Sequence, residues 1–208
     1  EELWISDGTV GGTVLIQNIN INAGVGSQIQ DLTFFQGEIY FTANDGTTGG
    51  ETGRQLWRTS TSATPSAVKI SSGFSNFNPE ELTTFNGQIF FKANDGTNGI
   101  ELWSYNGIAA PTLTADINMM PGLGSNPSSF NIVGDKLLFT AFDGTAEALY
   151  SWSGGMLNTL TTGVTFTNPL SSVVWKGDLY FVANDGVNGF ELWKSDGTAG
   201  GTALVKNI

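Results

Sequence analysis

A phrase of eighteen residues opens and closes this chain, and it constrains the fold more than any other feature. Residues 2–19 read ELWISDGTVGGTVLIQNI and residues 191–208 read ELWKSDGTAGGTALVKNI, with thirteen identical positions. The Leu of the ELW phrase also recurs between these ends, so that the full series is Leu3, Leu56, Leu102, Leu149 and Leu192. The steps are 53, 46, 47 and 43 residues. A phrase that returns at a nearly fixed period of this length indicates an array of repeated structural units.

Two further markers recur in a fixed order with the ELW phrase. The first is Phe-x-Ala-x-Asp-Gly, which precedes the last four ELW phrases at residues 41–46, 91–96, 139–144 and 181–186. The second is Asn-Pro, at Asn78-Pro79, Asn126-Pro127 and Asn168-Pro169. Three markers in one order define the repeat as a structural unit rather than a chance similarity.

Each complete copy divides into four short strands. In the second copy these are residues 81–85, 88–93, 100–105 and 111–117. The Asn-Gly pair between the first two strands favours a type I′ hairpin, because both residues accept positive φ. No segment has a sustained 3.6-residue period, so the sequence predicts almost no helix.

The two faces of these strands predict how the sheets pack. In residues 38–43, Ile39 and Phe41 lie on one face and Tyr40 lies on the other. A sheet with bulky groups on both faces has to lie between two neighbours. The sequence therefore predicts an all-β fold, a β-propeller of four-stranded antiparallel blades. We prefer a propeller to a linear stack because the connection from one blade to the next is 12 or 13 residues long each time.

We predict a single domain, residues 1–208, with four complete blades and an N-terminal half blade. The half blade is 1–19, and the blades are about 32–70, 82–117, 130–161 and 172–208. Three arrangements stay open: a five-bladed ring with one incomplete blade, a four-bladed ring with the hairpin paired elsewhere, or a segment of a longer array. The start inside a motif favours the array as the biological context, and we expect five radial sheets, one of them incomplete, as the fold.

The phrases ELWKSDGTAGGTALVKNI and FVANDGVNGFELW resemble the ELWxxDGT repeat family of bacterial secreted and surface proteins. The resemblance covers essentially the whole chain and is strongest at residues 2–19 and 172–208. The middle copies depart from it, with SYNGIAAPT and SWSGGMLNT in place of the SDGT turn. It implies a propeller-like fold and an extracellular or cell-surface location, and it implies little about chemistry.

Composition excludes several classes of function. The chain has no Cys and no His, which removes Ser-His-Asp and Cys-His nucleophiles and the usual zinc ligands. Nineteen acidic residues against eight basic ones give a net charge of −11, which disfavours nucleic acid and anionic lipid as partners. No apolar run is long enough to span a bilayer, so we expect no membrane insertion.

The aspartates of the Phe-x-Ala-x-Asp-Gly marker are the candidate metal ligands. They are Asp45, Asp95, Asp143 and Asp185. Each is expected on the loop between the second and third strands, at the end of the blade where the loops between blades also lie. They either cap their own turns, which we prefer, or bind Ca²⁺ together with a neighbouring Asn amide and backbone carbonyls. No other cofactor is expected.

The other motifs have structural interpretations. Asp7 and Asp196 lie in SDGTxGGT turns, which resemble the Asp-box turns of sialidase-like propellers. The Glu of the ELW phrase is expected to pair across strands or to lie at a blade edge. The repeated tryptophans are expected to fill the space between blades rather than to form a sugar-stacking platform. They are Trp4, Trp57, Trp103, Trp152 and Trp193, while Trp175 is expected to be exposed.

One set of residues is compatible with catalysis. Asp31, Glu80 and Glu81 lie near the starts of inner strands, and a carboxylate pair is what glycoside hydrolysis requires. The sequence nevertheless favours a non-catalytic structural or adhesive module of a secreted or surface protein, with Ca²⁺ as a candidate stabilising ion. Its partners would be other protein chains, or copies of itself, bound through exposed strand edges. The alternative is a carbohydrate-binding (lectin) or glycoside hydrolase propeller with a glycan ligand.

Overall fold

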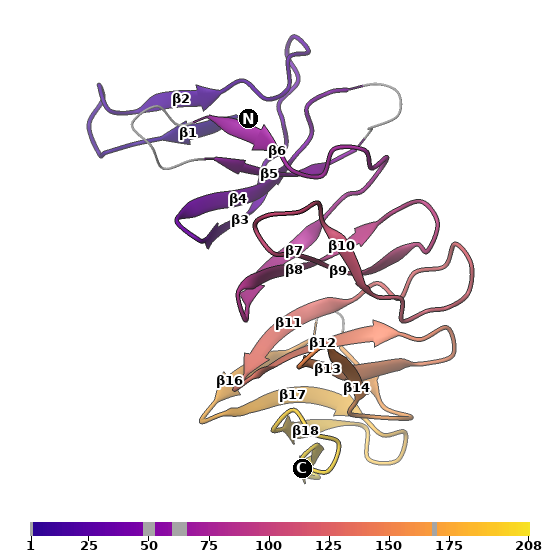
Figure 1. The fold of residues 1–208 in the computed structure, drawn as a ribbon. Coiled ribbons are helices and arrows are strands. Elements are labelled where there is room, and N and C mark those ends of the chain that lie inside the picture. The colour runs from indigo at the N-terminus through magenta and orange to yellow at the C-terminus, as the bar shows by residue number, and fades with distance from the viewer. Residues whose placement is uncertain (1, 48–52, 60–65, 168–169) are drawn as a thin grey trace. The chain divides into compact units, whose positions relative to one another are not determined.

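In a computed structural model, the chain folds into short antiparallel strands. The structure describes residues 2–47, 53–59, 66–167 and 170–208, and these contain nineteen strands and no helix (Figure 1). The expectation of almost no helix is therefore confirmed for the described residues. No helix in this part of the chain could cross a membrane.

The strands form one hairpin and four complete sheets, which we name blades I to IV (Figure 1). The N-terminal hairpin is β1 (Leu3–Ile5) and β2 (Val14–Gln17). Blade I consists of β3 (Gln30–Phe35), β4 (Glu38–Ala43), β5 (Gln55–Thr59) and β6 (Ala67–Lys69). Blade II consists of β7 (Glu80–Phe85), β8 (Gln88–Asn94), β9 (Ile100–Tyr105) and β10 (Thr112–Ala115). Blade III consists of β11 (Ser128–Val133), β12 (Lys136–Phe142), β13 (Glu147–Ser153) and β14 (Met156–Thr159).

Blade IV has the same four strands and one addition. Its strands are β16 (Ser172–Trp175), β17 (Asp178–Asn184), β18 (Phe190–Ser195) and β19 (Ala203–Lys206). A short strand, β15 (Thr165–Phe166), pairs with the end of β17 on the same edge as β16. The sequence did not predict β15, because two residues are too short for an alternating pattern to be visible. The other strands lie where the repeat predicts them, and their first and last residues differ from the prediction by only a few positions.

The hairpin between the first two strands of a blade turns as its sequence predicts. Asn86 and Gly87 both have positive φ, at 45° and 73°, which is the backbone of a type I′ turn. Lys176 and Gly177 adopt the same conformation. The tight turn sets the register of the first pair of strands and so decides which side chains share a face.

The chain divides into two compact units. Unit 1 is Glu1–Gly99 with Trp103–Thr114, and unit 2 is Ile100–Leu102 with Ala115–Ile208. The single-domain boundaries stay a prediction.

Unit 1 has two apolar clusters, one on each face of blade I. Phe41, Ala43 and Trp57 of blade I pack against Leu3 and Ile19 of the N-terminal segment. The opposite face of blade I packs against blade II in a cluster that includes Tyr40, Leu56, Ile89, Phe91 and Trp103. Blade I is therefore covered on both faces, as its bulky alternation predicted.

Unit 2 is built around the packing of blade III against blade IV. Leu138 and Leu149 of blade III contact Leu179 and Phe181 of blade IV, and Trp193 packs against the edge of the cluster. The segment between the two blades contributes four more buried side chains, Leu160, Val164, Phe166 and Leu170. The connection between blades is thus part of the core and not only a surface loop.

The tryptophan series follows the predicted packing only in part. Trp57 and Trp103 are buried, whereas Trp4 is exposed, since no described sheet of unit 1 covers its face of the hairpin. Trp152 was assigned to the wrong position, since Tyr150 pairs with Phe139 as Trp57 pairs with Phe41. Trp175 is exposed, as expected.

Candidate functional site

The loops at one end of the sheets form the candidate binding face. In unit 1 the Asn22 side chain donates to the Gly46 carbonyl at 3.0 Å, which joins the β2–β3 loop to the β4–β5 loop. In unit 2 the β10–β11 loop lies equally close to the β12–β13 loop. A Cβ added at Gly144 would lie 2.7 Å from Asn118 Oδ1. The two kinds of loop thus pack side by side in both units, and we call this end of each unit the loop face.

Glu101 organises the loop face of unit 2. Its side chain is fully buried at the start of β9, where its two oxygens accept four hydrogen bonds. Oε1 accepts the N–H groups of Asn118 at 3.2 Å and Ser125 at 2.8 Å. Oε2 accepts the N–H of Ile117 at 2.9 Å and the Ser125 hydroxyl at 2.5 Å. Burial raises the pKa of Glu101 although these bonds favour its ionised form.

The same position anchors the loop in three other copies, while in blade III it is Ala148, whose side chain cannot form hydrogen bonds. Glu2 accepts the N–H of Ile19 at 2.8 Å, and Glu191 accepts the N–H of Ile208 at 3.1 Å. Gln55 also bonds the following loop, but as a donor, since its side-chain N–H donates to the Phe74 carbonyl at 2.9 Å. The sequence predicted that this position would pair across strands or lie at a blade edge. Gln55 and Glu191 do lie opposite Ala43 and Ala183 in the register, but the bonds of these side chains to the following loop were not predicted.

The Asn-Pro marker supplies a second anchor for the same loops. The N–H of Asn126 donates to the Ile100 carbonyl at 2.9 Å, and the N–H of Asn78 donates to the Arg54 carbonyl at 3.0 Å. Gly124 makes this approach feasible, since a Cβ there would lie 2.1 Å from the Ile100 nitrogen. The Asn168–Pro169 copy of the marker lies outside the described residues. Each described Asn-Pro therefore fastens its loop to the residue just before the ELW phrase.

The four marker aspartates close their own turns. Asp95 Oδ1 accepts the N–H groups of Thr97 and Asn98, both at 2.8 Å. Asp185 makes the equivalent bonds to Val187 at 2.9 Å and Asn188 at 2.8 Å. Asp143 accepts from Thr145 and Ala146, and Asp45 accepts from Thr47 while its other oxygen lies 2.6 Å from Lys69 Nζ.

This geometry supports the turn-capping interpretation. Hydrogen bonds from the Asn188 and Val187 N–H groups lower the pKa of Asp185. The Asn184 side-chain oxygen, which the calcium hypothesis assigned to the ion, accepts the N–H of Gly186 at 2.7 Å. Among the residues that the structure describes, no group of three or more acidic side chains could hold a metal. Calcium binding by Asp45, Asp95, Asp143 and Asp185 stays a prediction.

The two SDGTxGGT turns are the same structure twice, bond for bond. Asp196 Oδ1 accepts the N–H and the hydroxyl of Thr198, at 2.8 and 2.7 Å. The Thr198 hydroxyl accepts the N–H of Gly201 at 3.0 Å. Asp7 and Thr9 make the corresponding bonds at 2.9 and 2.8 Å. Identical ends thus encode identical turns between the third and fourth strands, and their polar groups are used inside the turn.

The carboxylates of the hydrolase hypothesis do come together in unit 1. Asp31 is the second residue of β3 and Glu81 is the second residue of β7, and both have positive φ, at 54° and 60°. Each lies in a register shift of its strand pair, and such bulges redirect side chains. The N–H of Glu81 hydrogen-bonds the Asp31 carboxylate, while Lys92 Nζ lies 3.3 Å from Glu80 and 3.6 Å from Glu81.

Burial raises the pKa of Asp31, and the nearby charge of Glu80 adds to the effect. A carboxyl with a raised pKa beside ionised neighbours is the pattern of a general acid. Lys92 forms ion pairs with both glutamates on the same strand pair. This arrangement is also typical of an ion-pair cluster with a purely structural role.

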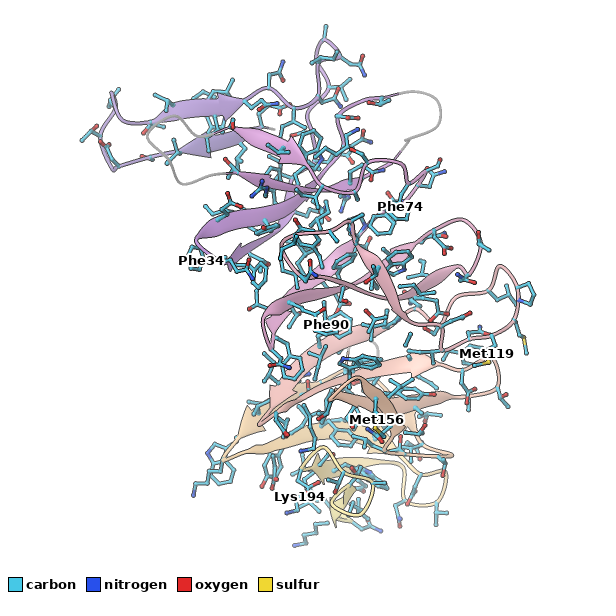
Figure 2. The ribbon with its side chains drawn as sticks, viewed as in Figure 1. Phe34, Phe74, Phe90, Met119, Met156 and Lys194 are labelled. Carbon is cyan, nitrogen blue, oxygen red and sulfur yellow. The ribbon has the colours of Figure 1, made fainter. Side chains whose placement is uncertain are left out.

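The loop face displays apolar side chains whose residue type differs from copy to copy. Met119 is 83% exposed and points away from the ribbon at the β10–β11 loop (Figure 2). Met120 and Leu123 of the same loop are also exposed. In unit 1 the corresponding β2–β3 loop exposes Ile21 and Val25. The anchors of these loops are thus similar, while the groups that face solvent differ.

Comparisons with known proteins identify the fold. No protein-family profile and no curated protein matches the chain. Among solved structures, it is similar to the β-propeller domain of the Trilobed protease from Pyrococcus furiosus, which has an open velcro topology. The TM-score is 0.56 at 12% identity, over 85% of this chain and 51% of that one.

The fold is that of a β-propeller. The prediction from the sequence is confirmed at this level, although this chain spans only about half the length of the matched structure. An endo-arabinase from Bacteroides thetaiotaomicron VPI-5482 also matches, with 11% identity over 83% of this chain and 76% of that one. Its TM-score of 0.32 is too low to support an argument.

The SDGTxGGT turn generates a prediction with a matched control. A Cβ at Gly201 would lie 2.1 Å from Asp196 Oδ1, whereas a Cβ at Gly200 meets nothing within 4 Å. We expect Gly201→Ala to lower the free energy of unfolding by about 2 kcal/mol, and Gly200→Ala to change it by less than about 0.5 kcal/mol. Urea unfolding measures both, and equal effects would contradict the turn's structural role.

The loop anchor generates a second prediction. In Glu101→Gln an amide N–H₂ replaces one acceptor, so a buried donor loses its partner, and we expect a loss of about 2 kcal/mol. Glu191→Gln is the control, because Glu191 bonds a single N–H at the chain end. Burial raises the pKa of Glu101, so its contribution to stability is present below the pKa that it has in the unfolded chain and is lost as pH rises through its pKa in the folded chain.

The gap between wild type and Glu101→Gln should therefore widen toward pH 4. Thermal unfolding across pH measures this gap. A gap that narrows at low pH would show that the carboxylate, rather than the carboxylic acid, is favoured by folding.

Proposed function

We propose that this chain is a non-catalytic binding and scaffolding module that recognises protein partners through the loop face. The observation that carries the proposal is that repeated side chains hold the turns and loops in place, while non-repeated side chains are exposed to solvent. Repeated polar residues such as Glu101, Asp95 and Asp196 bond the backbone of their own turns or loops. Residues that do not repeat, such as Met119, are left facing solvent. A constant framework that presents variable loops is a common basis for recognition.

The chemistry of the displayed groups favours a protein or peptide partner. Methionine side chains adapt their shape to different apolar partners. The net charge of −11 favours basic segments beside those apolar contacts. The resemblance to secreted and surface repeat proteins supports an extracellular location for this binding, and exposed outer strands such as β14 are secondary candidates for contact with other chains.

The test is a peptide-display selection on the immobilised whole chain. We expect selected peptides to combine apolar and basic residues, and to lose about tenfold in affinity for the double variant Met119→Ser/Met120→Ser. Met156→Ser is the matched control, because Met156 is also exposed but follows the β13–β14 turn, at the other end of blade III (Figure 2). Peptides that ignore the double variant, or that depend equally on Met156, would contradict the proposal.

A carbohydrate-active propeller is the second candidate, and the carboxylate group of Asp31, Glu80 and Glu81 is what favours it. If it holds, the chain should cleave a polysaccharide in a screen of plant and bacterial glycans, and Asp31→Asn should lower that rate at least about a hundredfold. Glu147→Gln serves as the control, since burial also raises the pKa of Glu147, but Glu147 belongs to blade III in the other unit. Binding to a glycan array without cleavage would point to a lectin instead.

A further inference from the structure

One face of blades I, III and IV carries three apolar or aromatic side chains at equivalent positions of the repeat. In blade I the trio is Phe35, Tyr40 and Leu56, all of them buried. The Phe35 and Tyr40 rings lie 5.6 Å apart, and the trio packs against Phe91 and Trp103 of blade II. This face therefore packs against the sheet that follows it in sequence.

Blade III repeats the arrangement in unit 2. Its trio is Val133, Leu138 and Leu149, and all three are buried. They lie in the cluster that contains Phe181 of blade IV, with Trp193 packed against it. In both units the partner surface includes the Trp of the next ELW phrase. The interface is thus a repeated one, and we call the trio side the leading face and the tryptophan side the trailing face.

Among the described residues of unit 2, no sheet packs against the leading face of blade IV. The corresponding residues are Trp175, Tyr180 and Leu192, and the two rings lie 5.8 Å apart, as in blade I. Trp175 is 55% exposed and Leu192 is 37% exposed, although Leu56 and Leu149 at the same position are fully buried. A hollow of about 320 Å³ lies over Tyr180, Val182 and Leu192. A face of this composition is normally covered.

The N-terminal hairpin has the opposite surface uncovered. Leu3 packs inward on blade I, as the leading face requires. Trp4 lies on the trailing face, where it pairs across the hairpin with Leu15. Trp4 is 58% exposed, although Trp103 at the same repeat position is buried. The hairpin therefore presents the kind of surface that covers a leading face elsewhere in the chain.

Charge favours the same match. The leading face of blade IV is bordered by Lys206, which is opposite Leu192 in the register, and by Lys194, whose Nζ lies 3.4 Å from Asp178. Lys176 Nζ lies 4.5 Å from the centre of the Trp175 ring. Residues 1–19 contain Glu1, Glu2 and Asp7 and no basic residue. A cationic border and an acidic hairpin attract each other.

We propose that the leading face of blade IV binds the N-terminal hairpin of a second copy of this chain, head to tail. This inference deepens the scaffolding part of the proposed function by naming the partner of one surface. An interface of this kind joins two different surfaces, so each added copy leaves one of each free, and assembly continues beyond a dimer.

Two single-site variants and a control test the interface. By sedimentation velocity we expect the wild-type mass to rise with concentration past that of a dimer. Trp4→Asp and Leu192→Asp should each weaken the association at least about tenfold. Val187→Asp, at an exposed site in the β17–β18 loop, should leave it unchanged. Far-ultraviolet circular dichroism of each variant shows whether it is folded.

Cross-linking identifies the surfaces directly, because the chain has no cysteine. A mixture of Leu15→Cys and Lys194→Cys chains, treated with a short bismaleimide, should give mainly the mixed dimer. Three results would overturn the proposal: a monomer at every concentration, a dimer that is indifferent to Trp4→Asp, or a cross-link that forms within one chain of the dilute double variant. None of these results would affect peptide binding by the loop face, which is measured separately.

Discussion

Each sheet of this chain has bulky apolar side chains on both faces, and the rest of the structure follows from that constraint. A sheet with one apolar face can leave the other in water, but blade I buries Phe41 on one side and Tyr40 on the other. It therefore needs a neighbour on each side, and the neighbours are copies of itself. The constraint explains why the repeat occurs in tandem, and why the terminal surfaces at Trp4 and Leu192 are the exposed exceptions.

The loops depend on a second constraint, which is that buried backbone groups need partners. The connection after β10 leaves several N–H groups without strand partners, and Glu101 accepts three of them. Burying a carboxylate is costly unless it is hydrogen-bonded, and this one is fully engaged. Glu101 consequently fixes the backbone of the loop, and the side chains that face solvent can differ between copies. The binding hypothesis for the loop face depends on this separation between anchoring and display.

Local motifs were predictable from the sequence, whereas anchors between distant residues were not. The turns at Asp95 and Asp196 close through bonds to residues two or three positions away, so their composition reveals their structure. The partners of Glu101 lie 16 to 24 residues away, so nothing next to it in sequence announces its role. Asp31 and Glu81 were correctly placed near the starts of inner strands, but their contact depends on two bulges that the pattern did not predict. Trp152 was assigned to the wrong position because it was aligned with the other tryptophans by residue type, whereas the strand register places Tyr150 there.

The sequence by itself determined most of the strands, their turns and the four complete blades, because the two-residue alternation and the Gly-containing turns are local properties of the backbone. It also determined that catalysis by His or Cys is excluded. Only the tertiary structure decided which copies of a repeated residue are buried. Leu149 and Leu192 occupy the same position of the repeat, yet blade IV covers Leu149, and no sheet among the described residues of unit 2 covers Leu192. Burial depends on the neighbouring sheet, which no single copy of the repeat encodes.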